Sequence, residues 1–294
     1  MLPGQSPKGF KLIDFFLLGF VALAAAYIAY RITVKLNYSW HWEMIPGYIV
    51  RFDPDTGKLT ANYLLTGLLT TLKLSIWGSF LAFVLGLVAA LARTSSSLLA
   101  RMLSRSYIEL MRNLPPLVII FIFYFFLADQ IVPLLGLDSF SEESNSLTVK
   151  IISAVLAPPD TLSPFISALV TLAAFEGAYV AEIIRSGLES VPAEQHQAAH
   201  ALGLSRYQSL RYIILPQALG QVLPLLAGQA ISLIKDSAIV SVISIQELTY
   251  QGTQLMASTY MTIEVWITIA CLYMILTLPC SLIVRRLEKQ LSVF

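Results

Sequence analysis

Two histidines four residues apart form the pair in this sequence that most suggests metal binding. His196 and His200 would share one face of a helix, at the spacing that zinc-dependent proteases use. Gln197 stands where such a protease carries the glutamate that acts as general base, and no third ligand lies nearby in the sequence. We therefore expect two surface histidines here and no metal site.

Motifs that bind nucleotides or supply a nucleophile do not occur in the sequence. There is no G-x-x-x-x-G-K-[ST], whose backbone would hold the phosphates of ATP. There is also no G-x-S-x-G, which would present a nucleophilic serine. We expect no catalytic residue and no cofactor. If ATP drives this chain, a separate subunit must bind the ATP and magnesium and carry out the hydrolysis.

Charged residues within the apolar segments are the remaining candidates for chemistry. A charge at membrane depth is costly and usually has a function. The deepest are Lys73, Glu176 and the adjacent pair Lys235 and Asp236. Glu176 would share a helix face with Tyr179 and Val180. It could line a solute path or pair with a lysine of a neighbouring helix, and both alternatives remain open.

A second acidic residue follows on the same segment, nearer its end. Glu182 and Arg185 are three residues apart, so on a helix their side chains could meet. We expect an ion pair at the edge of the membrane.

The composition indicates a membrane protein. Of 294 residues, 56% are hydrophobic and 13% charged, and the mean hydropathy is +0.72, which is too apolar for an ordinary soluble protein. The net charge of +1 argues against a nucleic-acid partner, which would require a basic surface. Cys271 and Cys280 would lie about 13 Å apart along a helix, beyond disulfide reach. We expect both to be small, buried apolar side chains.

Apolar runs predict about six membrane-spanning helices, each long enough to cross about 30 Å of hydrocarbon. Their expected ranges are about 13–33, 63–91, 115–135, 164–184, 222–245 and 263–284. The first run could instead be a signal peptide, but it is longer than the usual apolar part of one and lacks a clear cleavage site. The predicted fold class is therefore an all-α polytopic membrane protein with an N-terminal anchor.

Basic residues predict the orientation of these helices. They precede the first span, separate the second from the third, surround the polar segment after the fourth and follow the sixth. Such residues collect on the cytoplasmic side, so we expect both termini and the polar segment there. The external loop after the first span is an exception, with Lys35, Arg51 and Lys58. The insert 139–150 would lie outside.

The polar segment from Val191 to Leu219 is expected to form a helix, a bend at Gly203 and a second helix. Ser205 is a suitable N-cap for the second helix, and Pro216 marks either its end or a bend into the next span. A polar helix pair held between two spans suits a docking surface for a soluble partner.

The segment resembles the cytoplasmic EAA loop of ATP-binding-cassette importer permeases. The resemblance rests on Ala198-Ala199, on Gly203, and on Ile213-x-Leu215-Pro216; the longer pattern Gln195-x-x-Ala-Ala-x-Ala-Leu-Gly-Leu-Ser is similar to the branch that transports polar amino acids. Gln197 replaces the glutamate usual in that family, so a neutral hydrogen bond would replace an ion pair to the ATPase. The resemblance implies that coupling to the ATPase involves Gln197, Ala198, Ala199, Gly203, Leu204 and Pro216.

Three further patches resemble the same family in the expected order: Tyr107-x-Glu109-x-x-Arg112-x-x-Pro115, the run from Phe175 to Gly187, and Lys235-Asp236-Ser237-Ala238. The resemblance covers about residues 62–290, so we expect a permease domain at 62–290 and an added transmembrane helix with an external loop at 1–61. Candidate residues of the substrate path are Glu176, Tyr179, Lys235, Asp236 and Ser237.

The resemblance implies a set of partners in the inner membrane. These are a cytoplasmic dimer of ATP-binding subunits, a second permease subunit that is identical or paralogous, an external solute-binding protein, and a polar amino acid as substrate. The alternative is a secondary transporter driven by an ion gradient, which would show inverted repeats and broken helices at matching positions. No convincing repeat occurs in the sequence. The sequence does not identify the amino acid.

Overall fold

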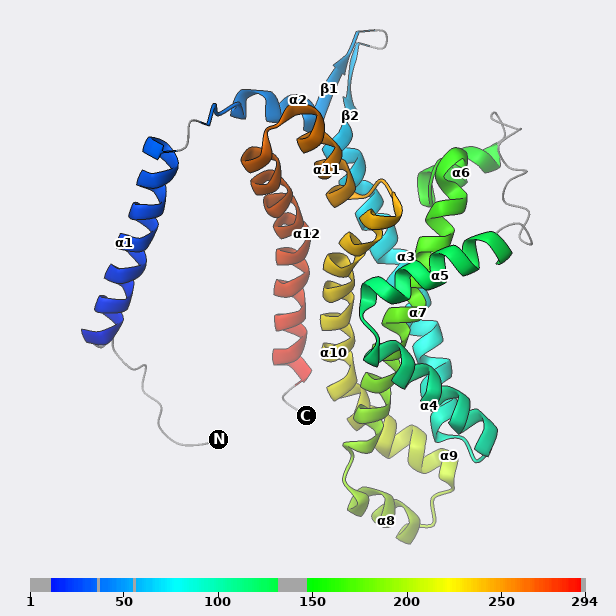
Figure 1. Cartoon of the computed structure of the whole chain (residues 1–294). Helices are drawn as coiled ribbons and strands as arrows, with labels where there is room; N and C mark the ends of the chain where they lie inside the picture. The colour runs from blue at the N-terminus through cyan, green and yellow to red at the C-terminus, as the bar shows by residue number, and fades with distance from the viewer. Residues whose placement is uncertain (1–11, 36–37, 55–56, 132–146, 292–294) are drawn as a thin grey trace. The chain divides into compact units, whose positions relative to one another are not determined.

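The protein is almost entirely helical (Figure 1). The computed structural model describes residues 12–35, 38–54, 57–131 and 147–291. Its α-helices are α1 (Leu12–Lys35), α2 (Ile45–Ile49), α3 (Tyr63–Thr94), α4 (Leu98–Asn113), α5 (Pro116–Ile131), α6 (Leu147–Val155), α7 (Pro159–Glu189), α8 (Ala193–Ala201), α9 (Arg206–Ser209), α10 (Leu215–Asp236), α11 (Leu248–Thr259) and α12 (Thr262–Leu291). The shorter elements are the 3₁₀ helices η1 (Trp42–Met44) and η5 (Ser237–Ile243), the π-helical turn η4 (Leu210–Ile214), and the strands β1 (Val50–Asp53) and β2 (Lys58–Ala61).

The chain consists of two units, Met1–Trp42 and Glu43–Phe294. The first contains α1, whose described apolar part is Ile13–Ala24. The second contains α2, the two strands and every later element.

The prediction of an all-α polytopic membrane protein is confirmed. Among the described residues, four helical stretches are each long and apolar enough to cross a membrane: 63–94, 159–189, 206–243 and 262–286. A fifth crossing requires α4 and α5 together, which are bent by 119° where they meet. Leu114 between them is extended, as expected for a residue before a proline. The end of the third expected span and most of the insert lie outside the described residues.

The helices α3 and α7 form the centre of the larger unit. Gly86 on α3 faces Val180 on α7 so closely that an added Cβ would lie 2.5 Å from Val180 Cγ1 and 2.8 Å from the carbonyl oxygen of Gly177. The small residues Gly86 and Gly177 therefore allow the two helices to approach closely. The core next to it is apolar and includes Leu74, Leu172 and Leu233.

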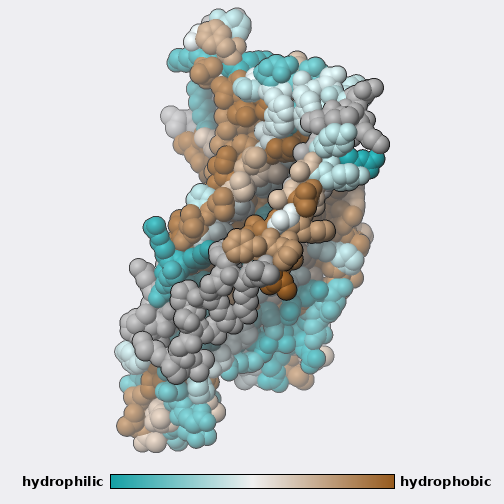
Figure 2. Space-filling view, turned by 90° about the vertical axis from the view of Figure 1, so that its left-hand side faces the viewer, coloured by the Kyte–Doolittle hydropathy of each residue, from teal (hydrophilic) through white to brown (hydrophobic). Residues whose placement is uncertain are grey.

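The described surface is strongly apolar, as a lipid-facing surface must be. Figure 2 shows hydrophobic residues over much of one side of the molecule, and the exposed side chains include Ile76 and Phe80 of α3. Cys271 of α12 is exposed and Cys280 is half-buried, so the expectation that both are buried is wrong for Cys271. In a helix that faces lipid, a small apolar thiol is satisfied without protein around it.

A short antiparallel hairpin forms one end of the larger unit, opposite α8 and α9 (Figure 1). Its register pairs Val50 with Ala61 and Asp53 with Lys58. Gly57 has a φ of +63°, which a glycine adopts at no steric cost. The two strands were not predicted from the sequence.

Candidate functional site

The polar loop, residues 191–219, has the predicted helix, bend and second helix. Helix α8 ends in a pair of hydrogen bonds: Gly203 N–H donates to the carbonyl of His200 at 3.0 Å, and Leu204 N–H donates to that of Ala199 at 3.1 Å. Gly203 has a φ of +75°, the left-handed conformation that this type of helix end requires. The bend is therefore specified by the glycine.

The second helix begins at a capping box and does not end at Pro216. The Ser205 hydroxyl accepts from Gln208 N–H, and the Gln208 side chain accepts from Ser205 N–H, at 3.3 and 2.9 Å. From Arg206 the chain remains helical to Ile243, passing through the π-helical turn η4. The wider turn precedes Pro216, which occupies the first turn of α10, where its missing N–H does no harm. The interpretation of Pro216 as the end of the helix is wrong.

The predicted coupling residues differ in how far they are exposed. Gln197, Ala198, Gly203 and Pro216 are exposed, and Leu204 is half-buried. Ala199 is fully buried by the chain itself, so its small side chain allows the loop to pack internally. It does not offer the surface for a partner that the sequence suggested.

Three exposed apolar or aromatic side chains of the polar loop were not singled out from the sequence. Leu202 is 77% exposed, Tyr207 65% and Tyr212 66%. Large exposed apolar groups on a polar surface mark a contact site. The sequence could have indicated them, because none of the three lies on the apolar face of either helix. The histidines His196 and His200 line a neighbouring hollow of about 400 Å³.

Glu176 lies at the centre of a second candidate site, within the spans. It is fully buried on α7, and its Oε2 accepts a hydrogen bond from Gln229 Nε2 of α10 at 2.5 Å. The side chain of Asp236, at the end of α10, lies next to it. Glu176 Oε1 has no hydrogen-bond partner among the described residues. Glu176 and Gln229 line a cavity of about 110 Å³, whose lining does not include Asp236.

Neither predicted lysine partner reaches Glu176 within the described part of the chain. Lys73 Nζ instead donates to the carbonyl of Ser153 at 2.9 Å, and Lys235 is exposed. The alternative in which a lysine neutralises Glu176 is therefore wrong. The contact between Glu176 and Gln229 was not predicted, because no local sequence pattern links positions 53 residues apart.

Of the residues assigned to the path, only Glu176 lines this cavity, and Ser237 and Tyr179 have other contacts. Ser237 is buried and donates to the carbonyl of Ile234 at 2.8 Å, so its hydroxyl serves the turn from α10 into η5. Tyr179 turns toward a different site, where the guanidinium of Arg112 lies 5.8 Å from its ring. Val180 lines the cavity with Glu176 as expected.

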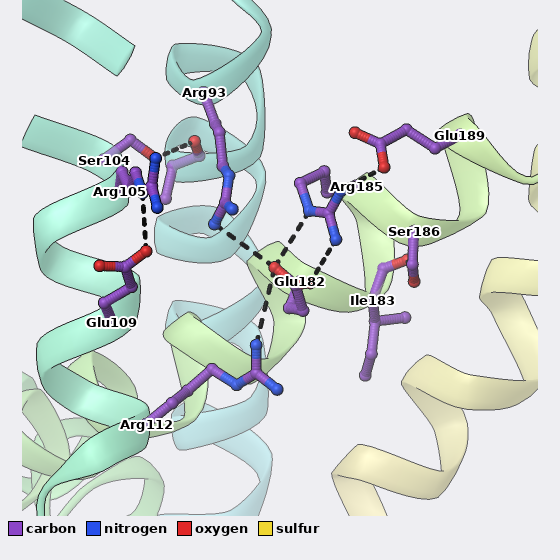
Figure 3. Close-up of polar contacts among 11 residues, drawn as sticks. Arg93, Ser104, Arg105, Glu109, Arg112, Glu182, Ile183, Arg185, Ser186 and Glu189 are labelled. Atoms are coloured by element: carbon purple, nitrogen blue, oxygen red, sulfur yellow. Dashed lines mark hydrogen bonds and ion pairs between the residues drawn. The ribbon is translucent and has the colours of Figure 1, made fainter. Parts of the chain in front are cut away.

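The third site is a set of ion pairs, here called the arginine cluster: Arg93, Arg112, Glu182, Arg185 and Glu189 (Figure 3). The predicted pair between Glu182 and Arg185 is confirmed, with Arg185 Nε 3.1 Å from Glu182 Oε2. The same oxygen lies 3.5 Å from Arg93 of α3 and 3.7 Å from Arg112 of α4. One carboxylate thus holds three helices together, immediately before the polar loop.

Comparison with known proteins identifies relatives of the whole region that carries these sites. The family described as "Binding-protein-dependent transport system inner membrane component" matches residues 82–293. The glutamine transport system permease protein GlnP of Escherichia coli K12 is 35% identical over 230 residues, which cover 78% of this chain and 93% of that protein. The octopine transport system permease protein OccM of Rhizobium radiobacter is 34% identical and covers 82% of this chain and 90% of OccM.

Solved structures show the same fold. An amino acid ABC transporter determined with histidines aligns with a TM-score of 0.62 and 32% identity, over 78% of this chain and 94% of that one. The MetNI methionine ABC transporter, in an inward-facing conformation, aligns with a TM-score of 0.56 and 19% identity over 78% of this chain and 96% of its own.

Proposed function

Because this chain belongs to the family of binding-protein-dependent transport system inner membrane components, we propose that it is the membrane-spanning subunit of an importer for a polar amino acid. It is a multi-pass membrane permease of the ATP-binding-cassette class. The relatives named for their substrates are glutamine, glutamate/aspartate and octopine permeases, and these compounds share an amino-acid zwitterion.

The polar loop is the observation that carries this function. It presents Leu202, Tyr207 and Tyr212 at the end of the larger unit opposite the hairpin. In the proposed mechanism a cytoplasmic ATPase dimer, which binds ATP and magnesium, docks on this surface. Its closure on ATP moves the loop, and α7 and α10 transmit the movement to the spans. The ATPase must bind the two states of the permease with different affinity, since that difference supplies the coupling free energy.

A second permease subunit, identical or paralogous, would complete the transport path. Support comes from uneven burial of the spans: 72% of the most apolar stretch of α7 is buried, against 28% for the stretch containing α10 and 6% for α12. The faces left open on α10 and α12 are available to lipid and to a second subunit. A solute-binding protein would deliver the substrate to the hairpin side.

We place Glu176 and Asp236 on the substrate path, because each could neutralise the ammonium group of an amino acid. Gln229 joins them as a residue that the sequence did not indicate. The cavity beside Glu176, at about 110 Å³, is well below the range of about 300–1,000 Å³ usual for small-molecule sites. In this conformation the path is therefore closed at Glu176.

Co-purification and reconstitution test this function. The tagged permease should retain an ATPase subunit, and proteoliposomes containing both should import an amino acid when the binding protein and ATP are supplied. Glu176→Gln should reduce import while leaving ATPase retention unchanged. A permease that imports the same solute under an ion gradient, without ATPase or ATP, would contradict the proposal.

A further inference from the structure

A cavity of about 260 Å³ lies near the hairpin end of the larger unit, apart from Glu176. Four separate segments enclose it: α3, α6, the start of α7 and the turn that follows η5. Its volume is close to the lower limit of about 300 Å³ for small-molecule sites, which suits a ligand the size of one amino acid.

Two opposite charges line this cavity without neutralising each other. Lys73 reaches it from α3 and Asp160 from the first turn of α7. They form no ion pair within 4.0 Å, and among the described residues neither has a charged partner. Lys73 donates one hydrogen bond, to the carbonyl of Ser153, so two of its three N–H donors remain available.

The turn after η5 contributes polar groups to the same cavity. Ser244 and Gln246 line it, and both are exposed. Ser244 has a φ of +62°, a left-handed conformation that is rare for a residue other than glycine and is found at functional sites more often than elsewhere. The walls therefore offer a cation, an anion and an uncharged amide around one small space.

We propose that this cavity is an amino-acid binding site in the outer half of the permease, in which Lys73 holds the α-carboxylate and Asp160 the α-ammonium group of the substrate. Gln246 faces the substrate's side chain. An amino-acid zwitterion carries one charge complementary to Lys73 and one complementary to Asp160, and charge-assisted hydrogen bonds to both ends orient it. The inference rests on the proposed function and adds a first site that a substrate occupies before it reaches Glu176.

The structural role of Lys73 has to be separated from this binding role. Its hydrogen bond to Ser153 also fastens α6 to α3, so a lysine variant could lose binding through a local rearrangement. Substrate analogues separate the two roles. If Lys73 binds the carboxylate directly, its loss should weaken binding of ligands that carry a carboxylate and leave binding of a ligand without one unchanged.

The experiment uses the complete transporter in nanodiscs, without the binding protein. L-glutamine, L-glutamate and L-arginine serve as probes, together with 4-aminobutanamide, which lacks the α-carboxylate of glutamine, and glutaramic acid, which lacks the ammonium. Wild type should bind at least one of the three amino acids, and it should bind the two glutamine analogues measurably but more weakly. Lys73→Met should weaken amino-acid binding about ten- to a hundredfold and leave binding of the amine without a carboxylate unchanged. Asp160→Asn should weaken amino-acid binding to a similar extent and leave binding of glutaramic acid, which has no ammonium group, unchanged.

Lys150→Met is the matched control, because Lys150 is an exposed lysine of α6 that does not line the cavity. It should bind as wild type does. The inference is overturned if wild type binds none of the three amino acids, or if both variants weaken amino acids and analogues equally. Either result can coincide with normal ATP-driven import, which would leave the proposed function intact. Failure of import in wild type would contradict the proposed function itself.

Discussion

Gly203 determines the shape of the polar loop through its backbone alone. An added Cβ would meet no atom within 4 Å, so the space around it is open. The constraint is its φ of +75°, which costs a residue with a side chain about 1–2 kcal/mol, and a β-branched one the most. Asparagine tolerates this conformation better than other residues.

Gly203→Val should therefore weaken the contact with the ATPase while leaving the spans inserted. We expect less ATPase retained on purification and ATP hydrolysis that the loaded binding protein stimulates several-fold less. Gly203→Asn should lie close to wild type, which separates backbone strain from added volume. If valine and asparagine behave alike, the left-handed bend is not what the coupling requires.

Glu247 is a buried carboxylate that fixes the position of α11. Its Oε1 accepts from Tyr250 N–H at 2.7 Å, which caps the helix, and its Oε2 accepts from Tyr273 at 2.9 Å and Thr71 at 3.4 Å. It thereby joins α3, α11 and α12. Burial raises the pKa of Glu247 above its usual value, although these hydrogen bonds lower it in part.

Glu247→Ala should lower the apparent Tm more than Glu247→Gln, because it leaves donors on Tyr250, Tyr273 and Thr71 without an acceptor, at about 1–3 kcal/mol for each that stays buried. A carboxyl with a raised folded pKa contributes most below its unfolded pKa of about 4.3 and loses that contribution as the pH rises through the folded pKa. The Tm of wild type relative to Glu247→Gln should thus fall as the pH rises above the unfolded pKa of about 4.3. A constant difference would show that Glu247 does not titrate there.

At the level of elements, the arginine cluster connects the polar loop to the rest of the bundle. Glu182, Arg185 and Glu189 lie on the last turns of α7, and their partners Arg93 and Arg112 come from α3 and α4 (Figure 3). The side chains of Glu182 and Arg185 are only 22% and 21% exposed. Such pairs are screened less by solvent than surface pairs are.

Glu182→Gln should destabilise the bundle by more than the roughly 1 kcal/mol that an exposed pair provides, because it leaves three guanidinium groups facing a neutral amide. Glu109→Gln is the control, since its pair with Arg105 is exposed and should contribute little to stability. Adding Arg112→Gln to Glu182→Gln should recover part of the lost Tm by relieving repulsion. If the Tm changes of the two single variants simply add in the double variant, Arg112 is not coupled to Glu182.

The sequence predicted elements better than it predicted contacts. Period and length located four of the six expected spans among the described residues, and local chemistry specified the bend at Gly203 and the cap at Ser205, because those signals involve neighbouring residues. Helix α4 was not predicted to be part of a membrane crossing, because its polar residues do not match the apolar pattern of a span. The partner of Glu176, Gln229, and the direction of Tyr179 depend on how helices rotate against one another, which no local pattern records.

At the scale of the whole molecule, the two ends of the larger unit differ in their number of basic residues. Arg206 and Arg211 lie on the polar loop together with Glu194, and the arginine cluster next to it adds three more arginines, whereas the described hairpin carries Arg51 and Lys58 with Asp53 between them. An excess of arginine and lysine favours the cytoplasmic side. We therefore expect the polar loop in the cytoplasm and the hairpin outside, as the import function requires.

Labelling of single cysteines tests this orientation. In a background with Cys271→Ala and Cys280→Ala, Lys58→Cys and Arg206→Cys each place one thiol at an exposed position, on the hairpin and the polar loop respectively. A maleimide that cannot cross the membrane should modify Lys58→Cys in spheroplasts, and Arg206→Cys only after the membrane is permeabilised. The reverse pattern would contradict the orientation and, with it, docking of the ATPase on the polar loop. Labelling of both from outside would mean that the two ends do not lie on opposite sides of the membrane, a result that no arrangement of these spans as an importer permits.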